Sequence, residues 1–340
     1  MTRRPALALP LLPLWLLWLL MGLLAVVPGR ADAQSCAATA SPMDFGNVRP
    51  IRLTAVDASG SISVSCTWPL ISLAPNVRVC LNLGPGTGSS SGGVRYLVNG
   101  ANTMRYNLYQ DAARSQVWGS VYGGGSYNPI TFVLSKPLLG LTASRNLTYY
   151  GRLEPNQPDV ALAGGVTTEY ASAFQGIHAG LAVRFFALLD PGCAEIASPD
   201  SSFPFQVTAR AANDCIISAS DMRFTTTGLL KTDQDATTSL NIRCTNGNPY
   251  RISLSAGSSG NLLARRMQRS GGAGAATVDY QLYTTAARTT VWGDGTAGTG
   301  TATGTGTGQP QAVTVFGRVP AQSTPPPGTY RDTIIVTIAF

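Results

Sequence analysis

The residues of this chain best suited to chemistry are six cysteines and a single histidine, His178. The sequence contains no Cys-x-x-Cys pair, and one histidine adds few ligands, so the pattern argues against a zinc site. No Gly-x-Ser-x-Gly motif marks a hydrolase nucleophile. The three glutamates, Glu154, Glu169 and Glu195, form no spaced pair typical of a glycosidase. We therefore predict no enzymatic activity, no metal and no cofactor.

The first residues have the features of a secretory signal peptide. Two arginines precede an apolar run over residues 7–27, and residues 31–33 (Ala-Asp-Ala) supply the small side chains that signal peptidase requires. A membrane anchor is the alternative interpretation, but prolines interrupt and follow the apolar run. We predict that residues 1–33 are removed and that the exported chain begins at Gln34.

Disulfides persist in the oxidising compartment that export implies. Two cysteine pairs have nearly the same spacing, 30 residues in the first half of the chain and 29 in the second. The two remaining cysteines both precede the second pair and are left to pair with each other within the first domain. The predicted bridges are Cys36 to Cys66, Cys215 to Cys244 and Cys80 to Cys193.

Residues 106–119 and 280–293 are two copies of one sequence. Nine of their fourteen positions are identical, including Tyr-x-Leu-Tyr, Ala-Ala-Arg and Val-Trp-Gly. The two cysteine pairs with similar spacing occupy equivalent places in the copies. Because each copy is long enough to bury its own core, we predict two related domains, residues 34–200 and 201–340.

Strand signals dominate both copies. Residues 61–65, 239–243 and 250–255 alternate polar with apolar side chains, and 37 glycines and 22 prolines leave little room for long helices. We predict an all-β fold of two tandem immunoglobulin-like antiparallel β-sandwiches.

The last twelve residues also alternate. Their apolar positions Ile334, Val336, Ile338 and Phe340 share one face of a predicted strand, and no further strand follows in this sequence. An apolar sheet edge of this kind can be completed by a strand from another chain. We expect the second domain to lack its last strand and these four residues to contact the donated one. The alternative, a domain closed by its own strands, stays open.

These motifs together resemble the spore coat protein U domain, the pilin-type domain of archaic chaperone-usher pili. The first copy resembles the family less well at its end, where residues 165–170 replace the terminal motif and residues 181–188 add an apolar segment. In the second copy the residues that carry the resemblance are Cys215, Cys244, Tyr280, Leu282, Tyr283, Trp292, Gly293, Phe316, Gly317, Pro320, Gly328, Tyr330 and Asp332.

The resemblance implies a tip adhesin, since two-domain members of the family are of that type. It implies a periplasmic chaperone, an outer-membrane usher and a neighbouring pilin as partners, transit through the periplasm to the pilus tip, and attachment to abiotic or host surfaces in biofilms. Only Gln34 and Ser35 precede Cys36 after cleavage, too few to span a sheet at ~3.3 Å per residue. Residues 203–210 are placed like a donor arm, and either complete the first domain or begin the second.

The surface-binding loop is expected in the first domain, in the glycine-rich and aromatic residues 121–134. Its candidates are Tyr122, Tyr127, Ile130 and Phe132, and residues 68–73 and 136–141 are further candidates. The alternative is that the aromatic side chains enter the core. The second function considered is a self-contained carbohydrate-binding or surface-coat structural protein.

Nucleic acid is not an expected partner, although the formal net charge is +7. The basic residues are dispersed and only two are lysines, whereas nucleic-acid binding needs a clustered basic surface. Arg265, Arg266 and Arg269 form the one cluster, which we expect to be a solvated turn.

Overall fold

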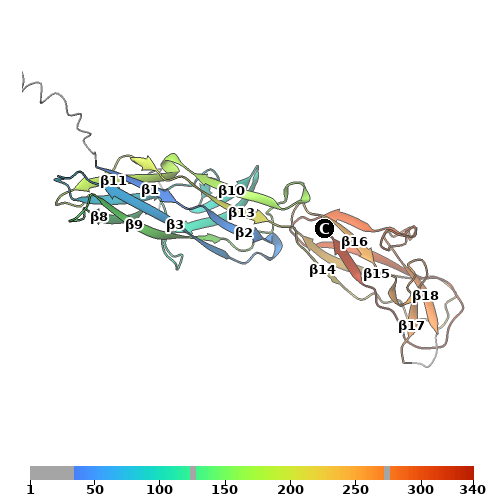
Figure 1. Cartoon of the computed structure of the whole chain (residues 1–340). Coiled ribbons are helices and arrows are strands. Elements are labelled where there is room, and N and C mark those ends of the chain that lie inside the picture. The colour runs from blue at the N-terminus through green and yellow to red at the C-terminus, as the bar shows by residue number, and fades with distance from the viewer. Residues whose placement is uncertain (1–33, 123–127, 272–275) are drawn as a thin grey trace, which may run out of the picture.

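The computed structural model describes residues 34–122, 128–271 and 276–340, which form two β-sandwich domains lying end to end (Figure 1). The first domain extends to Ala211 and the second begins at Cys215. No helix of the described residues is long and apolar enough to cross a membrane. The prediction of an all-β protein with two tandem sandwiches is confirmed.

Short alternating segments separated by turns build the first domain. Its elements are β1 (Ser35–Ala40), β2 (Met43–Val48), η1 (Pro50–Arg52), β3 (Val56–Thr67), β4 (Asn76–Leu83), β5 (Ser90–Ser91), β6 (Val94–Asn99), β7 (Asn102–Tyr109), β8 (Ile130–Ser135), β9 (Thr142–Leu153), η2 (Ala163–Gly165), β10 (Thr168–Phe174), η3 (Gly176–His178), β11 (Ala179–Phe186), η4 (Cys193–Glu195), β12 (Ser201–Ser202) and β13 (Phe205–Ala211).

The first domain packs a large sheet on a smaller one. The large sheet has the order β1-β3-β9-β7-β6-β10-β13-β2 with β5 beside β6, and the small sheet has the order β12-β11-β4-β8. Aromatic rings fill the space between them. Trp118 is fully buried, and the rings of Phe203 and Phe205 stack on it at 6.0 and 6.3 Å.

The second domain repeats this arrangement with fewer strands. Its sheets have the orders β14-β15-β20-β18-β17-β21 and β19-β16-β22. The larger order follows that of β1-β3-β9-β7-β6-β10 in the first domain. The elements are β14 (Cys215–Ala219), β15 (Gln234–Cys244), β16 (Pro249–Leu254), η5 (Gly257–Ser259), β17 (Arg265–Arg269), β18 (Thr277–Tyr283), β19 (Ala302–Thr305), β20 (Gln311–Val319), β21 (Tyr330–Arg331) and β22 (Val336–Ala339).

The repeated tryptophan joins the two sheets of each domain. The Trp118 backbone N–H donates to the carbonyl of Leu108 in β7, and its indole N–H donates to the carbonyl of Leu81 in β4 at 2.8 Å. The Trp292 indole makes the corresponding bond to Ile252 at 3.0 Å. Because a buried indole N–H needs an acceptor, these bonds fix how the sheets face each other.

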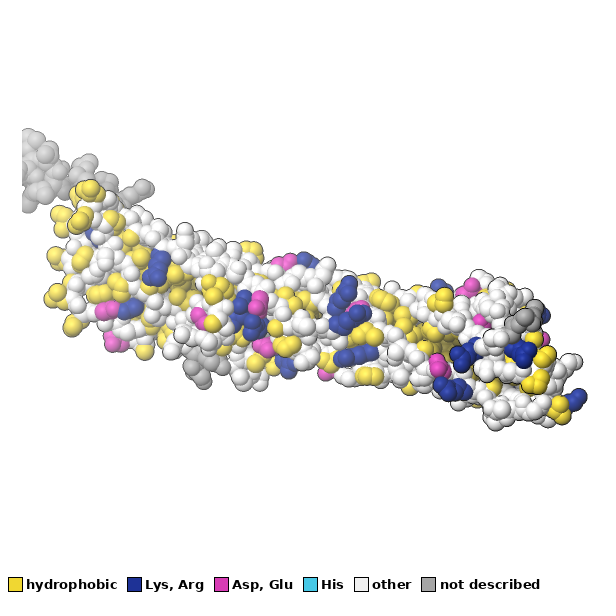
Figure 2. Space-filling model, turned by 90° about the horizontal axis from the view of Figure 1, so that it is seen from below, with side chains coloured by type: hydrophobic (Ala, Val, Ile, Leu, Met, Phe, Trp, Pro, Cys, Tyr) yellow, Lys and Arg dark blue, Asp and Glu magenta, His cyan; other side chains and the backbone are white. Residues whose placement is uncertain are grey.

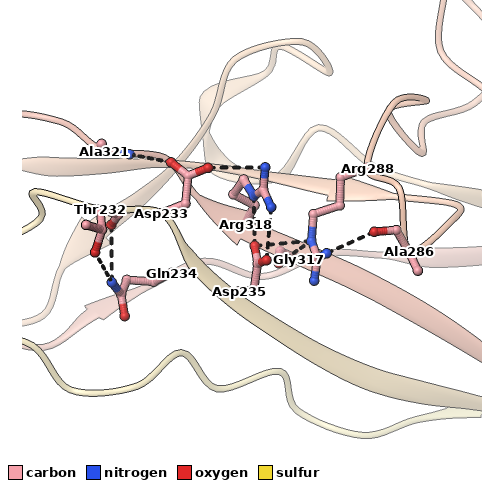
Figure 3. Close-up of polar contacts among 9 residues, drawn as sticks. All are labelled: Thr232, Asp233, Gln234, Asp235, Ala286, Arg288, Gly317, Arg318 and Ala321. Carbon is pink, nitrogen blue, oxygen red and sulfur yellow. Dashed lines mark hydrogen bonds and ion pairs between the residues drawn. The ribbon is translucent and has the colours of Figure 1, made fainter.

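The repeated Ala-Ala-Arg is a turn held by an ion-pair cluster (Figure 3). Arg288 adopts φ of 53°, and its guanidinium lies 3.2 Å from Asp235. Arg318 donates two hydrogen bonds to the same carboxylate, at 2.7 and 2.9 Å, and lies 3.1 Å from Asp233. The Arg318 hydrogen bonds hold the pKa of Asp235 below its usual value. The first domain has the equivalent set Arg114, Asp57 and Arg152.

A buried arginine lies beneath the tryptophan in each domain. The Arg265 guanidinium donates to the Gln281 side chain at 2.6 Å and to the carbonyls of Ser255 and Trp292 at 2.8 Å. Arg95 takes the same place in the first domain, where it donates to Asn107. These carbonyls would otherwise lack donors in a dry interior.

The expectation of a solvated turn at Arg265, Arg266 and Arg269 was wrong. These residues belong to strand β17, in which successive side chains point to opposite faces. Arg265 therefore faces the core, and Arg266 faces solvent and pairs with Asp279 at 3.0 Å.

All six cysteines form disulfides, in the predicted pairs. Cys36–Cys66 joins the paired strands β1 and β3, and Cys215–Cys244 joins β14 and β15. Cys80–Cys193 connects the middle of β4 to η4 and encloses 113 positions of sequence. The second domain has no counterpart of this third bridge among its described residues.

The junction between the domains lies later in the chain than the predicted division after residue 200. Strand β13 pairs inside the first domain, which leaves residues 212–214 as the connection. Arg52 donates two hydrogen bonds to Asp214, both at 2.7 Å. The Leu162 N–H donates to the carbonyl of Asn246 at 2.8 Å. Charged and backbone groups thus hold the two domains together.

Replacing the buried arginine tests this account of the core. Arg265→Lys is expected to destabilise the second domain by about 2–4 kcal/mol, because one ammonium cannot reach every acceptor of the guanidinium. Arg266→Lys, its exposed neighbour, is expected to stay within about 0.5 kcal/mol of the parent. Urea unfolding of the full chain measures both, and equal losses would contradict the buried role of Arg265.

Candidate strand-acceptor groove and apolar outer end

Strand β13 closes the first domain. It pairs antiparallel with β10 over residues 168–174 on one side and parallel with β2 on the other. Side chains from alternate positions of β13 enter the core: Phe205 is 7% exposed, and Val207, Ala209 and Ala211 are fully buried. The segment 203–210, whose place the sequence left open, therefore completes the first domain in cis.

The second domain is open at the same position. Among its described residues no strand pairs with the free side of β21. Met43 and Phe45 belong to β2, the strand paired with β13, and are 2% and 6% exposed. Their repeat equivalents, Met222 and Phe224, are half-buried in a segment that forms no strand. Equivalent residues thus line a closed core in one domain and an open groove in the other.

The strands at the edges of this groove are short. β21 has two residues where β10 has seven, and β22 has four where β11 has eight. Strands β10 and β11 are paired on both sides, whereas the described residues give β21 and β22 one partner each. An unpaired row of N–H and C=O groups therefore lies along the groove, ready for another strand.

The predicted contact residues lie on the β22 side of the groove. Ile334, Val336 and Ile338 are half-buried and pack against the second core, and Phe340 is 53% exposed at the end of the strand. The structure brings them to one edge, as their alternation indicated. Their contact with another chain stays a prediction.

The opposite wall of the groove is aromatic. Phe224 lies edge-on to Tyr280 with 6.5 Å between ring centroids. The Tyr280 hydroxyl donates to Asp332 at 2.6 Å, and Asp332 also accepts the Ser258 N–H at 2.9 Å. Burial, together with the adjacent Asp332 carboxylate, raises the pKa of Tyr280, so the ring stays neutral. With its hydroxyl satisfied, this wall suits apolar side chains.

A second candidate surface lies at the end of the first domain farthest from the junction. Three loops meet there, residues 68–75, 136–141 and 187–192, and Figure 2 shows hydrophobic side chains gathered at this end. The exposed large apolar residues are Leu70 (80%), Ile71 (85%), Leu73 (91%), Leu138 (104%), Leu139 (98%), Leu141 (36%), Leu188 (94%) and Leu189 (87%). An exposed apolar group of this extent marks an interaction surface.

Polar contacts at the base of these loops leave the leucines outermost. The Lys136 ammonium turns inward and donates to the carbonyls of Pro69 and Leu70 at 2.7 and 2.5 Å, which joins two of the loops. The Arg78 guanidinium pairs with Asp190 at the third loop. The charged groups thus hold the loops and their apolar residues point to solvent.

Three of the four loop residues named from the sequence are buried or half-buried rather than exposed on a binding loop. Phe132 is 6% exposed because it faces inward from β8, and Ile130 of the same strand is half-buried against the core. Tyr122 is half-buried, and its hydroxyl donates to the carbonyl of Ile196 at 3.2 Å. Tyr127 lies outside the described residues. The further candidates, residues 68–73 and 136–141, supply most of the exposed leucines.

The third loop was missed, although its sequence carries a signal. Leu188 and Leu189 are adjacent and follow the end of a strand, as Leu138 and Leu139 do. Two successive side chains of an extended segment point to opposite faces, so both cannot enter one core. Adjacent leucines in a loop therefore indicate exposure.

Metal-ligating groups do not gather in the part of the chain that the structure describes, where no three His, Cys, Asp or Glu side chains are close enough to hold an ion. His178 lies in η3, and its backbone carbonyl accepts the Gly84 N–H at 3.1 Å.

The fold and groove define a tandem β-sandwich protein with one closed and one open domain. The chain belongs to the spore coat protein U domain family, which it matches over residues 22–167 and 201–337. Both matches begin 14 residues before the first cysteine of their copy.

Individual proteins are similar to smaller parts of the chain or at low sequence identity. Protein U of Myxococcus xanthus is 37% identical over 120 residues, which are 33% of this chain and 63% of that protein. The chain of the CsuC–CsuE chaperone–tip adhesion subunit complex from Acinetobacter baumannii has a TM-score of 0.46 at 17% identity, over 90% of this chain and 100% of that one. The CupB6 tip adhesin of Pseudomonas aeruginosa gives a TM-score of 0.34 at 11% sequence identity, over 90% of this chain and 94% of that one.

Matched phenylalanine substitutions test the open groove. Phe45→Ala is expected to destabilise the first domain by about 3–5 kcal/mol, as for a fully buried ring. Phe224→Ala is expected to cost the second domain less than half as much in the free chain, since this ring keeps contact with water. Hydrogen exchange of the full chain, analysed by domain, measures both losses. A Phe224→Ala loss as large as that of Phe45→Ala would mean that the groove is closed.

Proposed function

We propose that this protein is an adhesive subunit at the tip of a chaperone-usher pilus, whose second domain accepts a donor strand from the next subunit. The observation that carries the proposal is the vacant strand position between β21 and residues 222–227, which β13 fills in the first domain. Membership of the spore coat protein U domain family supports the same role, because the resemblance noted in the sequence implies a pilin-type domain.

The first domain also specifies what a donor strand needs. By analogy with β13, it runs antiparallel to β21 and parallel to residues 222–227, with an apolar side chain at every second position. In β13 these positions go from Phe205 through Val207 to Ala209 and Ala211, so the side chains become smaller toward the junction end. We expect the donor to follow this order of sizes.

The predicted removal of residues 1–33 supports the tip position. The family matches place residues 22–35 of the first copy where residues 201–214 stand in the second, and the latter stretch contains β13. Cleavage after residue 33 removes most of the first stretch and leaves Gln34 and Ser35 before Cys36. Two residues cannot pair along a groove that β13 fills with seven. Such a subunit accepts a strand and donates none.

Export and assembly complete the proposal. A groove lined by half-buried apolar residues is an aggregation hazard in the periplasm, so a chaperone strand is expected to occupy it until the usher replaces that strand with a pilin arm. The assembled protein then stands on the cell surface, where attachment leads to biofilm formation.

Adhesion is assigned to the loops of the outer end. Their eight exposed leucine and isoleucine side chains suit apolar abiotic or host surfaces. The loops lie at the end opposite the junction, so the groove can bind its partner while they bind a surface (Figure 1).

A peptide experiment tests the strand-acceptor role. A synthetic peptide copied from residues 201–213, or from the N-terminal arm of a pilin of this family, is added to the purified chain. At a hundredfold excess over its Kd, either peptide is expected to raise the melting temperature of the second domain by about 5–15 °C. The control peptide carries aspartate in place of Val207 and is expected to have no effect.

Expression in the periplasm with and without the cognate chaperone is a second test of the strand-acceptor role. Without the chaperone most of the chain is expected to be lost in the periplasm to aggregation through the open groove, and the chaperone is expected to restore the yield of soluble protein. A soluble monomer whose second domain is as stable as the first and indifferent to every peptide would contradict pilus assembly, and would favour a self-contained binding or coat protein.

Loop substitutions test adhesion separately. Leu138→Asp with Leu139→Asp is expected to reduce binding to polystyrene at least tenfold, because each leucine that enters an apolar contact contributes about 1.5–3 kcal/mol. Folding should be unaffected, since both side chains are almost fully exposed. The matched control is Leu229→Asp, an exposed leucine of the second domain. Unchanged binding measured with a quartz crystal microbalance would exclude these loops.

A further inference from the structure

The first domain has its outer loops at one end and its connection to the second domain at the other (Figure 1). If the protein is a pilus adhesin, as proposed above, any pull on an attached cell passes along this axis. The chain leaves the first domain directly from the end of β13, and residues 212–214 lead into β14. Tension therefore reaches the first domain through β13.

Strand β13 lies so that this tension acts along it. Its last residue, Ala211, pairs with Thr168 and Val48 near the junction, and its first, Phe205, pairs with Phe174 nearer the outer end. A pull toward the second domain thus slides β13 along both neighbours. In this shear geometry the ladder bonds share the load, whereas in peeling they break one after another.

Side chains add resistance to sliding. Arg210 of β13 donates to Asp44 at 2.7 Å and to Asn47 at 3.3 Å on the β2 side, and lies 3.6 Å from Glu169 on the β10 side. Deeper in the domain, Phe205 stacks on Phe174 with 4.8 Å between centroids. A displacement of one residue along the strand would break these contacts together.

The disulfides limit how much chain can be released. Force applied at residue 34 crosses from Cys36 to Cys66. It can then cross from Cys80 to Cys193, which bypasses the chain between them, a sequence separation of 113. Only the segment between Cys66 and Cys80, and the segment from Cys193 to the junction, remain in the load path.

We propose that the first domain is a tension-bearing element in which β13 is a shear clamp and the Cys80–Cys193 disulfide limits the extension if the clamp yields. The clamp raises the force that the domain withstands. The disulfide keeps the chain from Cys80 to Cys193, and with it the outer loops 136–141 and 187–192, outside the stretched path.

Single-molecule pulling of the full processed chain, with handles on residue 34 and after Phe340, tests this without any surface or pilus. With disulfides intact, the first domain is expected to yield at higher force than the second and to release about 35 residues, at most about 120 Å. Unfolding of the second domain is recognised by its longer release, about 95 residues or about 330 Å. Cys80→Ser with Cys193→Ser is expected to lengthen the first-domain event by 113 residues, or about 380 Å.

Arg210→Ala tests the clamp, with Arg184→Ala on β11 as the matched exposed control. Loss of the Arg210 contacts is expected to raise the forced-unfolding rate about two- to fivefold and the control to leave it unchanged. The proposal is overturned if the first domain yields at or below the force of the second, or if Arg210→Ala behaves as the control. A first-domain release much longer than about 35 residues with the disulfides intact also overturns it. That measurement uses the parent chain, so it remains possible if the serine variant does not fold. Failure of the peptide or adhesion experiments would not change these readings.

Discussion

The rest of this structure depends on one strand position in the larger sheet of each domain. It lies next to β10 in the first domain and next to β21 in the second. Occupied by β13, it gives β10 its full length, buries Met43 and Phe45 and completes the aromatic core around Trp118. In the second domain, where no described residue occupies it, the neighbouring strands shorten and the equivalent side chains meet water. Because backbone pairing and apolar burial depend on the same strand, both change together.

The two domains have kept the same internal framework and differ at their edges. The indole that bridges the sheets, the buried arginine and the Asp-Arg turn cluster recur in both copies. These groups need no strand from outside, so they hold an incomplete sandwich in shape. That explains how the second domain can keep a formed groove while one strand position is vacant.

Features with a local sequence signature could be predicted, namely the repeat, the strands and the disulfides. The place of β13 could not, because its alternating pattern fits an edge in either domain and the choice depends on which groove the chain reaches. Arg265 was misplaced because a charged residue next to another suggests a solvated turn, whereas a strand sends the two to opposite faces. Phe132 was misplaced for the same reason, since a strand inside a glycine-rich segment returns its aromatic side chain to the core.

The protein exposes apolar residues at two places with different consequences. At the outer end they stand on loops, whose backbone offers no continuous row of free N–H and C=O groups, so they attract apolar surfaces without templating strand pairing. At the groove they accompany unpaired strand edges, and burial and hydrogen bonding then act together on any extended chain. Under the proposed function the first surface stays exposed until it meets its target, and we expect the second to be covered from synthesis onward. We therefore expect the second domain to need a strand from a partner, whereas β13 already completes the first domain.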